Sequence, residues 1–546
     1  MLISCVASIA ARAAHNGYAA AFVEHTATSP CGSGVCGAAT LAQNIATLAR
    51  HAATAGSNGA QIIVFPEYGI TGFSSYPKQA WISGGYAVAI PLAPAALDAR
   101  VVPCAAAARF PAPIVALSCA ARSARIALVA NLVDHNVSTG TLFNTDVAFD
   151  TDGAYLAKYA KQNLWGEANI DVPQSCPLAT FTTNFGVTFG LLTCADLIYA
   201  RPAAALLAAG VTDFVVPLAW SNAMAQMQIL PWAQAFSLTH SVNLVVANHK
   251  TRSESGSAAI ERGAVLAYEY ALGARDGAVH VARFGAAAAR TAASEGRDRA
   301  GARHRALLPP PQSRSSHRTA FPPSPWAFAR LAQDGSAVTV CAAPPSTLCC
   351  HTAATATSGT AYVLAALDGD DTDAGVAWSA QACALLYCPA GEASARCLAY
   401  HQPGHELEPA LGLGGASARG SPRSAASTKA TTLGLLSALT LRASGLGLGA
   451  GGLVFPEVLV ASPSAPQRLM PPLPDRAPNA SDVGGGFHFI DCAARDGNAT
   501  LFVRAPSGAS GASGDASGDA SGGGISSVVL YGRAFARDQL PYACPQ

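Results

Sequence analysis

The stretch Gly190-Leu-Leu-Thr-Cys-Ala-Asp196 is a short apolar run that ends in a cysteine, an alanine and an aspartate. It is followed by the helix-like stretch Arg201-Pro-Ala-Ala-Ala-Leu-Leu-Ala-Ala209. The pattern predicts a buried strand that ends near Cys194 and a helix that begins soon after it. The positive potential of a helix N-terminus would favour the thiolate of such a cysteine. Taken alone, however, Cys194 is better explained as a packed core residue, because free cysteine is among the most buried residue types.

Two earlier stretches also place one ionisable residue at the end of a predicted strand. Ile62-Ile-Val-Phe-Pro-Glu67 leads into a loop that glycines bracket, and Tyr159-Ala-Lys161 ends a predicted hairpin strand. A glutamate after Phe-Pro or a lysine on a hairpin is individually compatible with a solvated surface role. The three residues together predict a site at the ends of three strands.

A glutamate, a lysine and a cysteine in this chain order resemble the catalytic set of the nitrilase superfamily of carbon-nitrogen hydrolases. Further segments resemble the vanin and biotinidase branch of that superfamily in order and approximate spacing. These segments are Phe143-Asn-Thr-Asp-Val-Ala-Phe-Asp-Thr-Asp-Gly153, Tyr159-Ala-Lys-Gln-Asn-Leu164, Leu192-Thr-Cys-Ala-Asp196, Leu218-Ala-Trp-Ser-Asn222, Val454-Phe-Pro-Glu-Val-Leu459 and Val529-Leu-Tyr-Gly-Arg533. The resemblance therefore covers nearly the whole chain.

The resemblance implies an α/β fold, with a nitrilase-like α-β-β-α sandwich followed by a smaller, mostly β domain. It also implies the roles of the site residues. Cys194 would be the nucleophile, Glu67 the general acid and base, and Lys161 the stabiliser of the oxyanion, with the backbone N–H of Ala195 as a second oxyanion donor. This chemistry requires neither a metal ion nor a cofactor.

Four more residues are candidates for the same site. Glu167 could orient Lys161, as a glutamate does in members of the superfamily, or could lie on the surface. Trp165 and Trp220 could wall the substrate pocket. Asp196 is expected to cap a helix or to accept backbone N–H groups rather than to perform chemistry.

The resemblance implies a small-molecule substrate, a linear secondary amide, with pantetheine cleaved to pantothenate and cysteamine as the leading candidate. Hydrolysis of biocytin or other biotinyl amides is the alternative within the branch. A cysteine peptidase would need a histidine beside Cys194, and His240 and His249 follow in the chain. A non-catalytic secreted binding protein on the same fold is the third alternative. The segment 251–266 matches the branch only loosely and is expected to line the substrate site.

The order of strand and helix signals divides the chain. Residues 17–285 alternate strand and helix patterns, which is typical of an α/β domain. Residues 286–325 are rich in Pro, Arg and Ala, and we interpret them as a linker or insertion; a solvated spacer is favoured over an anion-binding segment. Residues 326–546 carry β-rich segments separated by turns, with low-complexity loops at 412–427 and 506–524.

Several features favour a secreted or lumenal protein. Residues 1–16 resemble a cleaved signal peptide without a basic n-region, and a ragged N-terminus is the alternative. The fifteen cysteines suit an oxidising compartment, and those from Cys341 to Cys397 predict disulfides, with zinc ligation as the competing interpretation. Asn136, Asn479 and Asn498 begin N-glycosylation triplets.

Composition argues against two other classes of protein. The 34 basic and 33 acidic residues remove any whole-chain electrostatic case for binding nucleic acid. No uninterrupted apolar run reaches the roughly 18–20 residues of a membrane-spanning helix. No apolar tail follows residue 533, so we expect no GPI anchor and a soluble product.

Overall fold

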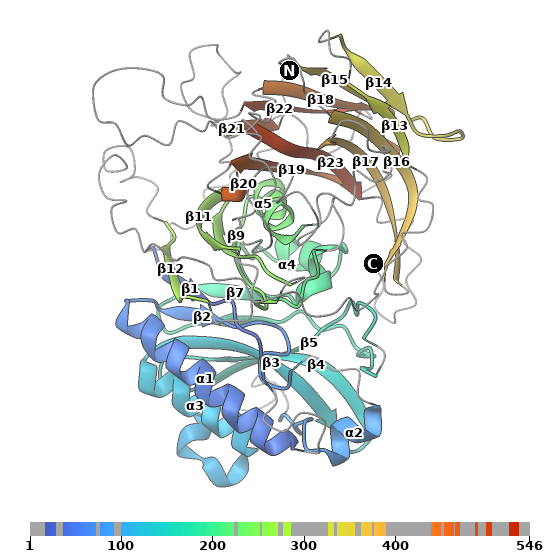
Figure 1. The fold of residues 1–546 in the computed structure, drawn as a ribbon. Helices are drawn as coiled ribbons and strands as arrows, with labels where there is room; N and C mark the ends of the chain where they lie inside the picture. The colour runs from blue at the N-terminus through green and yellow to red at the C-terminus, as the bar shows by residue number, and fades with distance from the viewer. Residues whose placement is uncertain are drawn as a thin grey trace, which may run out of the picture.

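The computed structural model describes residues 17–285 and 326–533, apart from residues 29–35, 73–76, 92–99, 168, 223–227, 252–253, 271–276, 332–335, 355–361, 374–375, 389–437, 449–451, 463–464, 470–485, 490–497 and 505–523. The N-terminal part contains two six-stranded sheets, and the C-terminal part contains one six-stranded and one five-stranded sheet. Figure 1 shows the two parts stacked on each other, with the C-terminal sheets beyond helices α4 and α5.

The first sheet has the strand order β12-β1-β2-β3-β4-β5, in which β1, β2 and β3 are parallel. Its strands are β1 (Ala19–Phe22), β2 (Ile62–Val64), β3 (Ala127–Asn136), β4 (Thr141–Phe149), β5 (Tyr155–Ala160) and β12 (His280–Arg283). The short apolar runs of β1 and β2 are buried on both faces, as expected for parallel strands between two layers.

The second sheet has the order β11-β10-β9-β8-β7-β6, with β7, β8 and β9 parallel. Its strands are β6 (Thr180–Thr182), β7 (Thr188–Leu191), β8 (Asp213–Pro217), β9 (Asn243–Ala247), β10 (Ser257–Glu261) and β11 (Ala264–Glu269). Phe22, Val64 and Val129 of the first sheet share a buried cluster with Val215 and Val245 of the second. The two sheets therefore pack face to face.

Helices cover the outer faces of this pair of sheets (Figure 1). The helices are α1 (Gly37–Ser57), α2 (Lys78–Ser83), α3 (Ala112–Ala124), α4 (Ala203–Ala208) and α5 (Ile229–His240), with short 3-10 helices η2 (Pro103–Ala105), η3 (Ala107–Arg109) and η4 (Cys194–Leu197). Leu41, Ile45, Leu48 and Ala52 lie at helical spacing on α1 and are buried against the first sheet. The α-β-β-α order that the sequence predicts is confirmed.

The C-terminal part is a β-sandwich. One sheet has the order β13-β16-β17-β23-β19-β20 and the other β14-β15-β18-β22-β21. The strands are β13 (Ala327–Arg330), β14 (Val338–Cys341), β15 (Cys349–Ala354), β16 (Tyr362–Asp373), β17 (Val376–Tyr387), β18 (Ala438–Ser444), β19 (Leu453–Ser462), β20 (Ala465–Leu469), β21 (Gly486–Phe489), β22 (Asn498–Arg504) and β23 (Gly524–Arg533). The predicted mostly β character of this part is confirmed.

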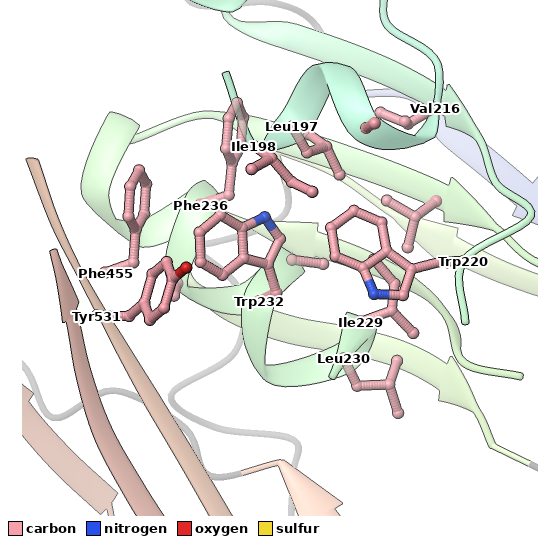
Figure 2. Close-up of a cluster of buried hydrophobic side chains, with 14 of the residues drawn as sticks. Leu197, Ile198, Val216, Trp220, Ile229, Leu230, Trp232, Phe236, Phe455 and Tyr531 are labelled. Carbon is pink, nitrogen blue, oxygen red and sulfur yellow. The ribbon is translucent and has the colours of Figure 1, made fainter. Parts of the chain in front are cut away.

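The sandwich packs on the N-terminal half through α5, a helix that the sequence patterns did not predict. Trp232 of α5 meets Phe455 of β19 at 4.9 Å and Tyr531 of β23 at 5.3 Å between ring centroids. Figure 2 shows these rings in one cluster with Ile198 and Phe236. Helix α5 is buried along most of its length, so it lacks the polar stripe by which an amphipathic helix is recognised.

Both the N-terminal and the C-terminal parts of the chain contain disulfides. Cys104–Cys119 joins η2 to α3, and the C-terminal sandwich contains Cys341–Cys349 and Cys350–Cys383. The prediction of disulfides over zinc ligation is confirmed for these cysteines; Cys397 lies outside the described residues. In the same described residues the one free cysteine is Cys194.

Several sequence predictions fall partly or wholly outside the described residues: the signal peptide over 1–16, the linker over 286–325, the loops at 412–427 and 506–524, and Asn479. The other two glycosylation candidates are exposed, Asn136 at the end of β3 and Asn498 at the start of β22. Among the described residues, no helix is both long and apolar enough to cross a membrane.

Candidate active site

The three predicted catalytic residues converge at one edge of the paired sheets. Glu67 follows β2, Lys161 follows β5 and Cys194 follows β7, so two come from the first sheet and one from the second. All three are buried, with exposed fractions of 1%, 2% and 6%. The site thus lies where the ends of strands from the two sheets meet, which is a common position for binding sites in α/β folds.

Lys161 lies between two carboxylates. Its Nζ donates to Glu67 Oε1 at 2.8 Å and also to Glu167 Oε1. Burial alone would lower the pKa of Lys161, but the charges of Glu167 and Glu67 outweigh burial and hold this pKa well above its usual range. Lys161 is therefore a fixed cation, as an oxyanion stabiliser must be.

The side chain of Glu167 lies inside the site and not on the surface of the protein. Its side chain is 4% exposed, and its Oε2 accepts from Tyr68 Oη at 2.6 Å and from Asn144 Nδ2 at 3.0 Å. The Nδ2 of Asn144 also donates to Glu67 Oε1 at 2.6 Å. Asn144 therefore fixes the two carboxylates relative to Lys161.

Glu67 is also held by the second sheet. Ala219, in the loop after β8 (Asp213–Pro217), donates its N–H to Glu67 Oε2 at 2.8 Å. The Nε2 atom of His249, after β9, lies 2.6 Å from the main-chain oxygen of Glu67. A glutamate fixed from both sheets can receive and return a proton at one place.

Cys194 sits in a strained turn as the first residue of η4. Its φ is +46°, and Tyr68, next to Glu67, has φ +54°. Such angles cost a non-glycine residue about 1–3 kcal/mol and are typical of functional sites. The turn is held by Asp196 Oδ2, which accepts the N–H of Thr193 at 2.9 Å, and by Asp146 Oδ2, which accepts Thr193 Oγ1 at 2.7 Å.

Asp196 behaves as the sequence predicts. It forms a capping box with Thr193 and accepts from Tyr159 Oη at 2.7 Å and from the N–H of Asn163 at 3.1 Å. Burial raises the pKa of Asp196 to about 6 and raises that of the neighbouring Asp146 well above its usual range. This buried network joins the segment after β5 to the turn that carries Cys194.

The expectation that the helix N-terminus favours a thiolate is not met. Burial and the charge of Glu67 raise the pKa of Cys194 well above its usual value, although Lys161 and the N–H of Ala219 oppose them. Burial is the largest of these effects. A raised pKa favours the protonated thiol, so attack by the sulfur calls for a nearby base that removes the proton.

The two tryptophans take different positions. The backbone N–H of Trp165 donates to Glu167 Oε1 at 3.4 Å, and the half-buried ring of Trp165 meets Trp378 of β17 at 4.8 Å between centroids. Trp220 is 4% exposed and stacks on Trp232 within the cluster of Figure 2. Both side chains therefore contact the hydrophobic core, and their role as pocket walls stays a prediction.

The two histidines considered from the sequence do not pair with Cys194. His240, at the end of α5, packs against Phe236 and Phe455, and His249 contacts the main chain of Glu67. In the part of the chain that the structure describes, no hydrogen bond joins a histidine to Cys194.

The supporting polar residues were not assigned from the sequence. Asn144 and Asp146 lie in the quoted segment 143–153, and Tyr68 follows Glu67 directly. Polar side chains inside otherwise buried strands were the available signal, because a buried amide or carboxyl needs partners. In the described residues no group of three or more His, Cys, Asp or Glu gathers as a metal site.

Comparisons with known proteins agree with this geometry. Residues 25–251 match the model of the carbon-nitrogen hydrolase family. A biotinidase of Takifugu rubripes is 35% identical over 222 residues, covering 38% of this chain and 43% of that protein. A pantetheinase of Sus scrofa is 31% identical over 253 residues, covering 43% of this chain and 47% of that protein. The chain thus matches about half the length of these relatives.

An amidase from Nesterenkonia sp. AN1 is similar in structure, with 21% identity, a TM-score of 0.37, and coverage of 49% of this chain and 90% of that one. The family match over residues 25–251 confirms the resemblance to the nitrilase superfamily that the sequence motifs carry. The chain therefore contains a carbon-nitrogen hydrolase domain, in a form similar to that of biotinidases and pantetheinases.

Proposed function

We propose that this chain hydrolyses a linear secondary amide through a thioester on Cys194. The observation that carries the proposal is the buried Lys161, which bonds Glu67 and Glu167 beside a free thiol. Burying a cation and two carboxylates carries a large desolvation penalty, and buried ion pairs often add little to the stability of a fold. The arrangement therefore favours a chemical role for these residues.

In the proposed reaction, Glu67 takes the proton of the Cys194 thiol, and the sulfur attacks the carbonyl carbon of the amide. Negative charge on the carbonyl oxygen is stabilised by the Lys161 ammonium and the N–H of Ala195. Glu67 then protonates the leaving amine as the C–N bond breaks, which leaves an acyl thioester on sulfur.

Water completes the cycle. Glu67 removes a proton from a water molecule, whose oxygen attacks the thioester carbonyl, and the proton then returns to the sulfur of Cys194. The products are a carboxylic acid and an amine. Glu167 and Asn144 keep Lys161 and Glu67 in place through both steps, so they act by positioning.

Pantetheine is the substrate we favour, with biotinyl amides as the alternative, because the relatives include both pantetheinases and biotinidases. Purified full-length protein should release cysteamine from pantetheine faster than lysine from biocytin, as measured by mass spectrometry. Faster cleavage of biocytin would replace the first choice. Saturable binding of either compound without turnover would indicate the non-catalytic binding protein, and hydrolysis of a nitrile alone would contradict the branch assignment.

We also propose that the protein is secreted or resides in the lumen of the secretory pathway. The disulfides of the described residues and exposed Asn136 support this compartment.

Alkylation before and after reduction, followed by peptide mapping, tests the compartment on protein from its native source. Cys194 should react without reduction once the protein is denatured, whereas Cys350 and Cys383 should react only after reduction, because they form a disulfide. Alkylation of all cysteines from Cys341 to Cys397 without reduction would contradict the secretory proposal.

A further inference from the structure

The side chain of Arg533, at the end of β23, extends from the C-terminal sandwich to residues 193–198, which carry Cys194 and are called the nucleophile turn below. Arg533 is fully buried, and its Nε donates to the carbonyl oxygen of Ile198 at 3.0 Å. Ile198 directly follows the 3-10 helix η4 as its C-cap, and the first residue of η4 is Cys194. A residue far away in the sequence thus bonds the short segment that carries the thiol.

The guanidinium group is held on both of its sides. One of its terminal nitrogens donates to the carbonyl oxygen of Ser379 on the neighbouring strand β17, and the group lies over the ring of Tyr199 at 5.7 Å from the centroid. The backbone of Arg533 pairs with Ala380 and with Leu453, so β23 is an inner strand here. The planar fork therefore connects a fixed strand of the sandwich to the catalytic domain.

A second contact joins the same corner of the sandwich to the lysine side of the site. Trp378 precedes Ser379 on β17 and meets Trp165, which lies four residues beyond Lys161. The indole Nε1 of Trp378 donates to Tyr531 Oη at 2.5 Å. The segments that follow Lys161 and Cys194 thus both rest on this sheet.

The strained turn needs support at each end. Asp196 and Asp146 hold Thr193, on the N-terminal side of Cys194. On the other side, the carbonyl groups at the end of η4 lack donors within the helix, and a cation there satisfies one of them favourably. Because the N–H of Ile198 also donates to the carbonyl oxygen of Ala195 at 2.9 Å, a shift of Ile198 would move the residue next to the thiol.

We propose that Arg533 is a positioning residue that keeps the nucleophile turn in its reactive geometry, so that the C-terminal sandwich is part of the catalytic unit. Arg533 acts through Ile198 and does not touch the reacting atoms. The effect on turnover rests on the proposed function, whereas the effect on the geometry of Cys194 does not.

The test compares Arg533→Lys and Arg533→Met with Thr352→Val in the full chain. Thr352→Val is the matched control because it removes a buried hydrogen bond of the sandwich, from Thr352 Oγ1 to the carbonyl oxygen of Thr440, in the sheet that does not contain Arg533. Both Arg533 variants should lower kcat by about tenfold or more and leave KM within about twofold, since a displacement of about 1 Å can cost a hundredfold in rate. The control should keep the wild-type kcat.

A second readout does not need a substrate. The rate at which iodoacetamide alkylates Cys194 in the folded protein should fall about fivefold or more in the Arg533 variants, because the thiol is displaced from its position beside Glu67 and Ala219. It should be unchanged in Thr352→Val. If the wild type hydrolyses no amide but this difference appears, the proposed function fails and the positioning role stands.

Equal kcat and equal alkylation rates in the Arg533 variants and the control would overturn the inference, whatever the loss of thermal stability. If both Arg533 variants fail to fold, Tyr199→Leu takes their place, because it removes the ring beneath the guanidinium and keeps Arg533. It should slow alkylation of Cys194 by about twofold or more. A wild-type rate in this variant would equally overturn the inference.

Discussion

Replacing Cys194 with alanine should abolish amide hydrolysis while leaving the fold intact. Activity should fall by about three orders of magnitude or more, because loss of a nucleophile removes the covalent path. The change from thiol to methyl leaves only a small cavity, so the free energy of unfolding should fall by about 1 kcal/mol. Turnover of the substrate and thermal unfolding of the same preparation provide the two measurements.

Cys194→Ser is the matched control, because it keeps the size of the side chain and replaces the thiol with a far weaker nucleophile. It should be as inactive as the alanine variant. Retention of more than about a tenth of the wild-type activity by Cys194→Ala would exclude the thioester mechanism.

Replacing Lys161 with methionine should remove activity and also destabilise the protein. The substitution leaves Glu67 and Glu167 buried without the cation that both contact. Breaking a buried ion pair in this way costs about 3–5 kcal/mol of stability, and loss of an oxyanion donor lowers kcat by about a hundredfold to a thousandfold. Lys161→Arg should not restore activity, because the larger planar group does not fit a site built around an ammonium.

Two further variants separate the stability effect from the catalytic effect. Adding Glu167→Gln to Lys161→Met removes one of the two stranded carboxylates and should recover stability but not activity. Lys158→Met, on strand β5 that precedes Lys161, breaks the ion pair with Asp134 at 2.7 Å outside the site and should retain activity. Wild-type kcat in Lys161→Met, or equal loss of kcat in Lys158→Met, would contradict the assigned role.

Local patterns predicted the α/β character and the strand ends, whereas the α-β-β-α sandwich and the assignment of Glu67, Lys161 and Cys194 followed from the resemblance to the nitrilase superfamily. The apolar runs before Glu67 and Cys194 are strands that end where the chemistry begins, and the structure brings these ends together with Lys161. Helix α5 was missed because it is buried nearly all round, so its sequence shows no polar face.

The support for the site could not be predicted from local patterns. Asn144 bonds Glu67 across 77 residues, and Arg533 bonds Ile198 across 335. Pairings over such distances depend on how whole sheets pack. The raised pKa of Cys194 was missed for the same reason, because its cause is burial by residues far away in the sequence rather than the adjacent helix.

The most direct test of the central claim is the mass of the protein during turnover. Purified enzyme mixed with pantetheine and quenched in acid within the first turnovers should gain the mass of a pantothenoyl group, and peptide mapping should place it on Cys194. The adduct should be absent from Cys194→Ala. Turnover without any adduct in the wild type, or an adduct on another residue, would contradict catalysis through a thioester on Cys194.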